Sequence, residues 1–105
     1  MSQHAAQFGI SLPTEALADF CRRWKVRELS LFGSVLRDDF RPDSDVDVLV
    51  RFDEGAQWSS FDLITMTDEL RLMFHREVDL VEADALRNPF RRQAIMESRQ
   101  IIYAA

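Results

Sequence analysis

Two aspartates at alternate positions are the first residues in this sequence whose types and spacing suggest chemistry. Asp45 and Asp47 lie in the run DVDVLVRF, which alternates polar and apolar residues and predicts a strand over Asp45–Phe52. Side chains two positions apart on a strand share one face, about 6.6–6.8 Å apart along the chain. Because two such carboxylates repel each other, a hard divalent cation with oxygen ligands is their usual compensation at neutral pH.

Asp79 is the candidate for a third carboxylate. It lies in the run EVDLVE, which predicts a second strand over Glu77–Glu82 and places Asp79 on its polar face. If the two strands are neighbours, Asp79 faces the space shared by Asp45 and Asp47. Three carboxylates suit Mg²⁺, which keeps several waters and takes further oxygens from substrate phosphates.

The dipeptide Gly33-Ser34 ends an earlier apolar run, VRELSLF, which predicts a strand over Val26–Phe32. A glycine that closes a strand lets backbone approach a ligand, and a helix start after it offers free N–H groups to phosphate. Ser34 adds a hydroxyl, and Arg37 lies one turn later as a candidate positive charge for the same anion.

Each of these features has a plainer reading. Two acids at a strand end are often solvated surface residues, and Arg37 is equally consistent with a solvent-facing side chain. The combination of the Asp-x-Asp pair with Gly33-Ser34 favours a site that holds a metal together with nucleotide phosphates. A zinc site is not favoured, because His4, His75 and Cys21 match no usual zinc spacing. Cys21 is expected to be a small buried hydrophobe.

The elements that must position these residues alternate along the chain. We expect helices from about Pro13, briefly at 34–39, after the capping box at Ser59, and after Asn88-Pro89, with a last strand at Ile101-Ile102-Tyr103. Apolar periodicity marks one side of the two later helices, at Phe61, Ile64, Leu70, Met73 and Phe74 and at Phe90, Ala94 and Ile95. The predicted class is α/β (α+β): a mixed β-sheet of about four strands with helices packed on it.

Composition bounds the remaining expectations. A chain of 105 residues with 47% hydrophobic content predicts one domain over 1–105. No run approaches the ~18 apolar residues of a membrane span, and MSQHAAQFGISLPTEA lacks a charged segment before an apolar run, so we expect a cytoplasmic protein without a membrane partner. A net charge of −5 disfavours direct nucleic-acid binding. A basic cluster near the end is more typical of a solvated helix face: Arg87, Arg91, Arg92 and Arg99.

Taken together, Gly33-Ser34, ten further residues, Asp-Val-Asp at 45–47 and Asp79 on a later strand resemble the minimal nucleotidyltransferases (MNT) of the polymerase β superfamily. The similarity of pattern runs from the first helix to the terminal IIY, and it implies the palm-like fold of that superfamily. It further implies that Gly33 and Ser34 bind a nucleoside triphosphate, that Asp45 and Asp47 hold two Mg²⁺ ions, and that Asp79 completes the site and helps to activate an acceptor hydroxyl.

The resemblance also implies a reaction and a partner. Family members are commonly encoded beside HEPN proteins as antitoxins, and some transfer AMP from ATP to a tyrosine of the toxin. The implied function is therefore transfer of a nucleoside monophosphate to a HEPN-type toxin. The alternative is a binding module that neutralises such a toxin by complex formation. A transferase acting on a small hydroxylated molecule is less favoured, because so short a chain leaves little for a second lobe, and a partner subunit, in a homo- or hetero-oligomer, is expected to present the acceptor.

Overall fold

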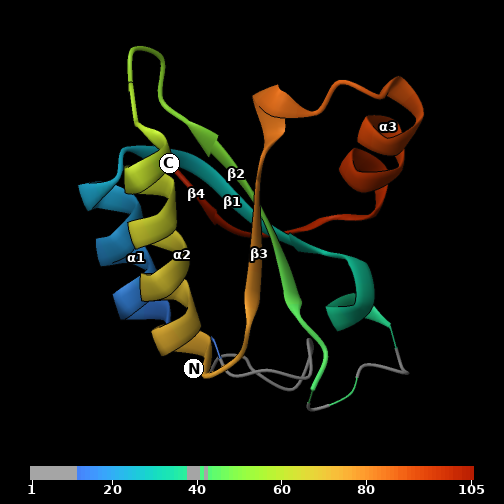
Figure 1. Ribbon diagram of the computed structural model, residues 1–105, viewed down its shortest axis with the longest axis horizontal. Helices are drawn as coiled ribbons and strands as arrows, with labels where there is room; N and C mark the ends of the chain where they lie inside the picture. The colour runs from blue at the N-terminus through green and yellow to red at the C-terminus, as the bar shows by residue number, and fades with distance from the viewer. Residues whose placement is uncertain (1–11, 38–40, 42) are drawn as a thin grey trace.

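The computed structural model describes residues 12–37, 41 and 43–105. A four-stranded sheet with the strand order β3-β2-β1-β4 runs through the molecule (Figure 1). Its strands are β1 (Val26–Phe32), β2 (Val46–Phe52), β3 (Val78–Glu82) and β4 (Gln100–Ala104). β1 is antiparallel to both β2 and β4, whereas β2 and β3 are parallel. The predicted mixed sheet of four strands is confirmed.

In the described part of the chain, one α-helix precedes the sheet and two α-helices and two short 3₁₀ turns lie between its strands: α1 (Thr14–Arg23), then η2 (Gly33–Leu36), α2 (Ser60–Phe74), η3 (Ala83–Ala85) and α3 (Pro89–Ser98). Figure 1 shows α1 and α2 side by side, with α3 on the other side of β3. The brief helix expected at 34–39 is the η2 turn, and positions 38 and 39 lie outside the described residues. No helix in the described part of the chain is long and apolar enough to span a bilayer.

Local chemistry explains where the two later helices begin. At the start of α2, Ser59 Oγ accepts a hydrogen bond from the Asp62 N–H at 3.2 Å, and Asp62 Oδ2 accepts one from the Ser59 N–H at 2.9 Å. This is the capping box that the sequence predicts. Asn88 Oδ1 caps α3 by accepting from the Phe90 N–H at 2.9 Å. α2 ends at His75, whose φ of 57° turns the chain towards β3.

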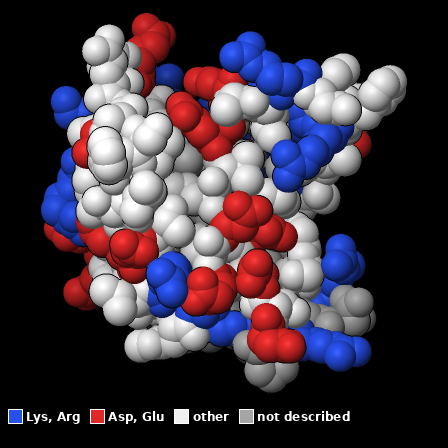
Figure 2. Space-filling model, viewed as in Figure 1, with Lys and Arg blue, Asp and Glu red and all other residues white. Residues whose placement is uncertain are grey.

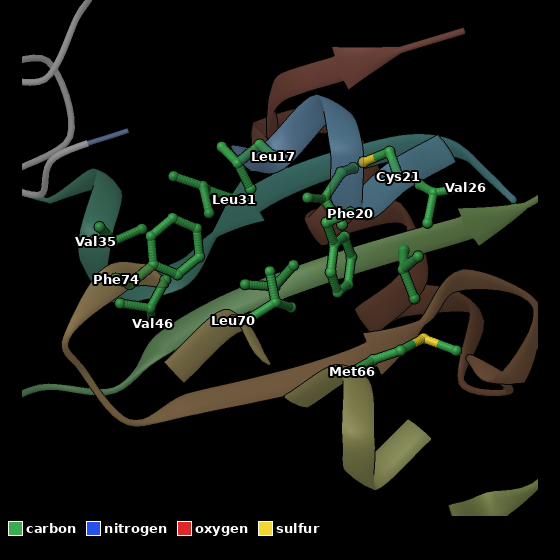
Figure 3. Packing of buried hydrophobic residues seen from close by; sticks show 13 residues of the cluster. Leu17, Phe20, Cys21, Val26, Leu31, Val35, Val46, Met66, Leu70 and Phe74 are labelled. Atoms are coloured by element: carbon green, nitrogen blue, oxygen red, sulfur yellow. The ribbon is translucent and has the colours of Figure 1, made fainter. Parts of the chain in front are cut away.

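The main core lies between the helices α1 and α2 and one face of the sheet (Figure 3). β2 contributes its alternate valines, and the helices contribute Leu17, Phe20, Cys21, Met66, Leu70 and Phe74. Cys21 is buried as predicted, and this burial raises the pKa of its thiol to about 12. A thiol that stays protonated at neutral pH is a poor nucleophile, so Cys21 is a packing residue.

The predicted apolar sides of α2 and α3 are partly wrong. Phe61 and Ile64 are 81% and 58% exposed, and Phe90 is 82% exposed. At 100° per residue Phe61 lies on the opposite side of α2 from Leu70, which faces the sheet. Phe90 and the exposed Ala94 likewise lie away from Ile95, the buried residue of α3. Apolar residues therefore occur on both sides of these helices, and only one side packs.

Candidate active site

The register of the sheet brings two of the three predicted aspartates together. Asp47 of β2 is the direct partner of Asp79 on the parallel strand β3. Neighbouring strands lie about 4.8 Å apart, and register partners share one face of the sheet. Asp45 immediately precedes the first residue of β2 and is exposed, as Asp79 is, whereas Asp47 is half-buried. The condition on which Asp79 was proposed, that its strand neighbours β2, is met.

The Gly33-Ser34 turn lies directly against Asp47. Gly33 has a φ of +76°, and a β-carbon at this position would lie only 2.1 Å from Asp47 Oδ2. The Ser34 backbone N–H donates a hydrogen bond to the Asp47 carboxylate, and Ser34 Oγ lies 3.5 Å from the Asp45 carbonyl oxygen. The absence of a side chain at 33 therefore makes room for the Asp47 carboxylate, a requirement that the sequence did not reveal.

The electrostatics of Asp47 show an excess of negative charge at this position. Its pKa is raised first by burial and then by the charges of Asp79 and Asp45. The positive charge of Arg91 and the hydrogen bond from Ser34 lower the pKa, but they do not cancel the other effects. Figure 2 shows acidic side chains gathered in the middle of this face, with basic side chains over the region of α3. A carboxyl whose ionisation is opposed by burial and by neighbouring negative charges, as that of Asp47 is, is suited to an added cation.

The donor chemistry fits a hard divalent cation. The acids around the Gly33-Ser34 turn offer carboxylate oxygens, which Mg²⁺ prefers. Across residues 12–37, 41 and 43–105, no three acidic, histidine or cysteine side chains already form a metal-binding group. Asp45 and Asp79 are exposed at their positions, so their side chains have room to rotate when a cation binds. Zinc remains unsupported, since Cys21 is buried in the core and His75 ends α2, while His4 lies outside the described residues.

Two arginines concern this site, the predicted Arg37 after η2 and Arg91 of α3. Arg37 is exposed directly after η2, and its N–H donates to the Ser34 carbonyl at 2.9 Å. It therefore lies next to the phosphate-binding candidates Gly33 and Ser34. The charge that acts on Asp47 comes from Arg91, four residues before Ile95 in α3. Because Ile95 packs with Leu49, which is on the Asp47 face of β2, the same side of α3 directs Arg91 to the acids.

The basic cluster near the end of the chain is not the uniform solvated face that the sequence favours. Arg92 donates a hydrogen bond to the Ala83 carbonyl at 2.6 Å, and Arg99 pairs with Glu28 at 3.3 Å. Arg91 acts on Asp47. Arg91 lies four residues and Arg92 three residues before Ile95, so helical spacing places both on the side of α3 that packs. Using this signal requires knowing that Ile95 faces the sheet.

An open pocket of about 730 Å³ lies beside the candidate site, at the end of α2. Its lining comes from the turn before β2, from the last turns of α2 and from the start of β3: Asp43, Ser44, Asp68, Arg71, Leu72, His75, Arg76 and Glu77. None of the three candidate aspartates lines it, although Ser44 directly precedes Asp45. The carboxylates lie on the open sheet face, not in this pocket.

A mixed sheet with an acidic pair at the start of one strand, a third acid on its parallel neighbour and a Gly-Ser turn against Asp47 is the arrangement expected of a nucleotidyltransferase. Residues 14–102 match the family described as "Nucleotidyltransferase domain". This match spans most of the sequence, and the chain belongs to that family. The enzyme class predicted from the sequence is thereby confirmed.

Individual relatives narrow the family. The chain is 31% identical over 93 residues to "Protein adenylyltransferase MntA" of Thermococcus cleftensis, covering 89% of each chain. A solved structure of a candidate minimal nucleotidyltransferase is 31% identical, with a TM-score of 0.68 and coverage of 83% of this chain and 86% of that one. A chain from the complex of tri-AMPylated Shewanella oneidensis HEPN toxin with MNT antitoxin shares the fold, with a TM-score of 0.62 at 17% identity, covering 88% of this chain and 70% of that one. The resemblance to minimal nucleotidyltransferases is confirmed.

Proposed function

We propose that this protein is an antitoxin that transfers AMP from ATP to a hydroxyl group, a tyrosine, of a cognate HEPN-type toxin, with Mg²⁺ as cofactor. The observation that carries the proposal is the register pair Asp47 and Asp79, in which Asp47 lies directly against the Gly33-Ser34 turn. The name of the Thermococcus cleftensis relative supports protein adenylylation. The fold shared with a chain of an AMPylated HEPN toxin complex supports the partner.

Each candidate residue has a role in this proposal. Asp45, Asp47 and Asp79 would hold two Mg²⁺ ions. When bound, these cations neutralise phosphate charge and stabilise the attacking and leaving oxygens of an in-line displacement. The Gly33-Ser34 backbone and the Ser34 hydroxyl contact the triphosphate, and Arg37 adds a positive charge at the end of the same turn.

The reaction replaces the phosphoanhydride bond between the α- and β-phosphates of ATP by a phosphoester bond to the acceptor. The acceptor oxygen bonds to the α-phosphorus of ATP while the bond to the bridging oxygen of the β-phosphate breaks, and pyrophosphate leaves. The acceptor proton passes to the carboxylate of Asp79, which is exposed on β3 and therefore reachable from outside. Since the aspartates lie on an open face of the sheet, a partner protein must cover the site and present the acceptor.

Mass spectrometry tests the proposal directly. The purified protein is incubated with ATP, Mg²⁺ and the HEPN-type protein encoded next to it, and intact masses are measured. We expect an added AMP on the toxin. The variant Asp79→Asn removes one carboxylate charge and should slow the modification at least about 10²–10³-fold. Asp53→Asn, an exposed acid in the turn after β2, is the matched control and should act like the wild type.

The same experiment separates the binding module from the enzyme. If the wild-type protein neutralises the toxin without adding any mass, and Asp79→Asn neutralises it equally well, transfer is refuted and complex formation is the function. If Asp79→Asn loses both the AMP adduct and neutralisation while it still binds the toxin, the enzymatic proposal stands.

A further inference from the structure

We propose that Arg76 is a positioning residue for the carboxylate site, because its guanidinium holds the backbone before Asp45 against the start of β3. The inference rests on the proposed function, since it concerns the same aspartates. It adds a residue whose guanidinium binds the backbone carbonyl that directly precedes Asp45, so that its effect on the site passes through the backbone of Asp45.

The turn that leads into Asp45 is organised around this guanidinium. Ser44 N–H donates to the Arg41 carbonyl at 3.0 Å, and Arg41 N–H donates to Ser44 Oγ at 3.2 Å, so that residues 41 and 44 form a closed turn. Both carbonyl oxygens at the ends of this turn then accept from one nitrogen, Nη2 of Arg76: the Ser44 oxygen at 2.9 Å and the Arg41 oxygen as well. Hydrogen bonds from a charged donor are stronger than those between neutral groups.

Asp45 needs this support because the sheet does not fix it. The register between β2 and β3 begins with the pair Val46 and Val78, one residue after Asp45. The Val46 N–H donates to the Glu77 carbonyl at 2.8 Å, which secures the side of Asp45 that faces the strand. The other side is Ser44, whose carbonyl is held by Arg76.

The two anchors of Asp45, the Glu77 carbonyl and the Arg76 guanidinium, come from adjacent residues before β3, the strand that carries Asp79. Arg76 and Glu77 are the two residues directly before β3. They follow His75, whose left-handed φ of 57° turns the chain at the end of α2. One anchor is backbone and the other is a side chain, and together they bracket Asp45 at the entrance to β2. Because Asp79 follows two residues after Glu77, this link relates the position of Asp45 to that of Asp79. Carboxylates that share a cation must be held within about 0.5 Å of the geometry that binds it. Loss of one anchor should therefore lower the affinity of the site for the cation.

Arg71 provides a matched control in the same pocket wall. Its guanidinium pairs with Asp68 Oδ1 at 3.2 Å and with Glu77 Oε2 at 2.8 Å, and all three side chains are substantially exposed. Arg71 therefore has the same charge and nearly the same location as Arg76, but it binds surface carboxylates, whereas Arg76 binds the carbonyls of the turn before Asp45. Its removal changes the local charge without releasing the Ser44 carbonyl.

The experiment compares Arg76→Met, Arg76→Lys and Arg71→Met with the wild type. Mn²⁺ is titrated in the presence of a non-hydrolysable ATP analogue, its binding is followed by electron paramagnetic resonance, and amide hydrogen exchange at Val46 is measured on the same proteins. We expect Arg76→Met to weaken Mn²⁺ binding about 10–100-fold and to speed exchange at Val46. Arg71→Met should stay within about twofold of the wild type. Arg76→Lys should recover part of the affinity, since one ammonium nitrogen donates to two carbonyls.

The outcomes distinguish this inference from the proposed function. If the wild type takes up no Mn²⁺ with the nucleotide analogue, the proposed function fails and the inference falls with it. If the wild type binds and Arg76→Met binds equally well, only the role of Arg76 is refuted. Equal losses in Arg76→Met and Arg71→Met would assign the effect to charge alone and also refute it. Should Arg76→Met not fold, Arg76→Lys provides the test. If Arg76→Lys exchanges the Val46 amide faster than the wild type but binds Mn²⁺ with the same affinity, the proposal is overturned.

Discussion

The two faces of β2 have different surroundings. On one face Val46, Val48 and Val50 are fully buried against α1 and α2. On the other face Leu49 is covered by Ile95 of α3, and Asp47 lies near the start of the strand beside Asp79 of β3. Because side chains alternate along a strand, a single segment of seven residues supplies both surfaces.

This comparison shows how so small a domain separates stability from chemistry. The covered face gains free energy by removing apolar side chains from water. The open face places like charges close together at Asp47, which opposes folding. Substitutions on the covered face should therefore lower stability strongly and leave the reaction unchanged, whereas substitutions on the open face should slow the reaction and change stability much less.

The largest expected effect tests the covered face. Leu70→Ala removes a fully buried side chain of α2 and leaves a cavity between that helix and the sheet. We expect the free energy of unfolding to fall by about 2–5 kcal/mol, measured by urea denaturation. Below the denaturation midpoint, the AMP-transfer rate per folded molecule should match that of the wild type, because Leu70 lies on the opposite side of the sheet from Asp47.

Leu72→Ala is the matched control for this prediction. Leu72 lies on the same helix but is 75% exposed, so its removal should change the unfolding free energy by less than about 0.5 kcal/mol. If Leu70→Ala slowed transfer per folded molecule as strongly as it destabilised the fold, the two faces would be coupled and the comparison would fail.

A smaller effect, on activity, tests the open face. Gly33→Ala would place a β-carbon 2.1 Å from Asp47 Oδ2 and would hold an L-residue at a φ of +76°. The Asp47 carboxylate must move, and a displacement of about 1 Å at a reacting centre reduces rates by up to about 10²-fold. We expect a 10–100-fold loss of AMP transfer in the adduct assay.

Gly55→Ala separates the displaced carboxylate from the backbone strain. Gly55 has a φ of +87°, similar to that of Gly33, but a β-carbon there would meet nothing within 4 Å. Both variants should lose about 1 kcal/mol of stability from the left-handed conformation. Only Gly33→Ala should lose activity, and an equal loss in Gly55→Ala would show that strain, not contact with Asp47, is responsible.

Most of the fold was accessible from the sequence because local signals were strong. The alternation in DVDVLVRF located β2 to within one residue, and Ser59 with Asp62 located the start of α2. The acidic pair and the glycine were recognisable because their chemistry depends on residue type and spacing. The pairing of Asp47 with Asp79 needed only one further assumption, that the two strands are neighbours.

The errors and omissions have a common physical cause. Phe61 is apolar yet exposed, because only the side of α2 that bears Leu70 meets the sheet. Arg91 acts on Asp47 through the way α3 packs, and Arg76 binds backbone carbonyls of a distant turn. Every residue has a backbone carbonyl, so no residue type marks such a partner in the sequence. Interactions fixed by tertiary packing were therefore missed, whereas those fixed by local pattern were found.

The smallest expected effect concerns the free energy of unfolding, which the Asp47 charge on the open face lowers. The pKa of Asp47 lies above its ordinary value of 3.8 because of burial first, then the charges of Asp79 and Asp45. Between the ordinary and the raised pKa, the folded state binds more protons than the unfolded state, so the wild type becomes more stable as pH falls through that interval. Asp47→Asn removes the unfavourable charge at neutral pH and should raise the free energy of unfolding there by up to about 1 kcal/mol, after allowance for solvent screening.

The pH dependence identifies the carboxylate as the source of this gain. The advantage of Asp47→Asn over the wild type should be greatest at pH 7 and should shrink as the pH falls from the raised pKa of Asp47 to its ordinary value of 3.8, because the folded wild type takes up the proton in that interval. Glu54→Gln, an exposed acid in the turn after β2, should show no such trend. Added Mg²⁺ should stabilise the wild type more than Asp47→Asn, because a bound cation relieves the same repulsion. A gain that persisted unchanged at low pH would mean that packing, not charge, limits this face, and the contrast between the two sides of β2 would lose its electrostatic basis.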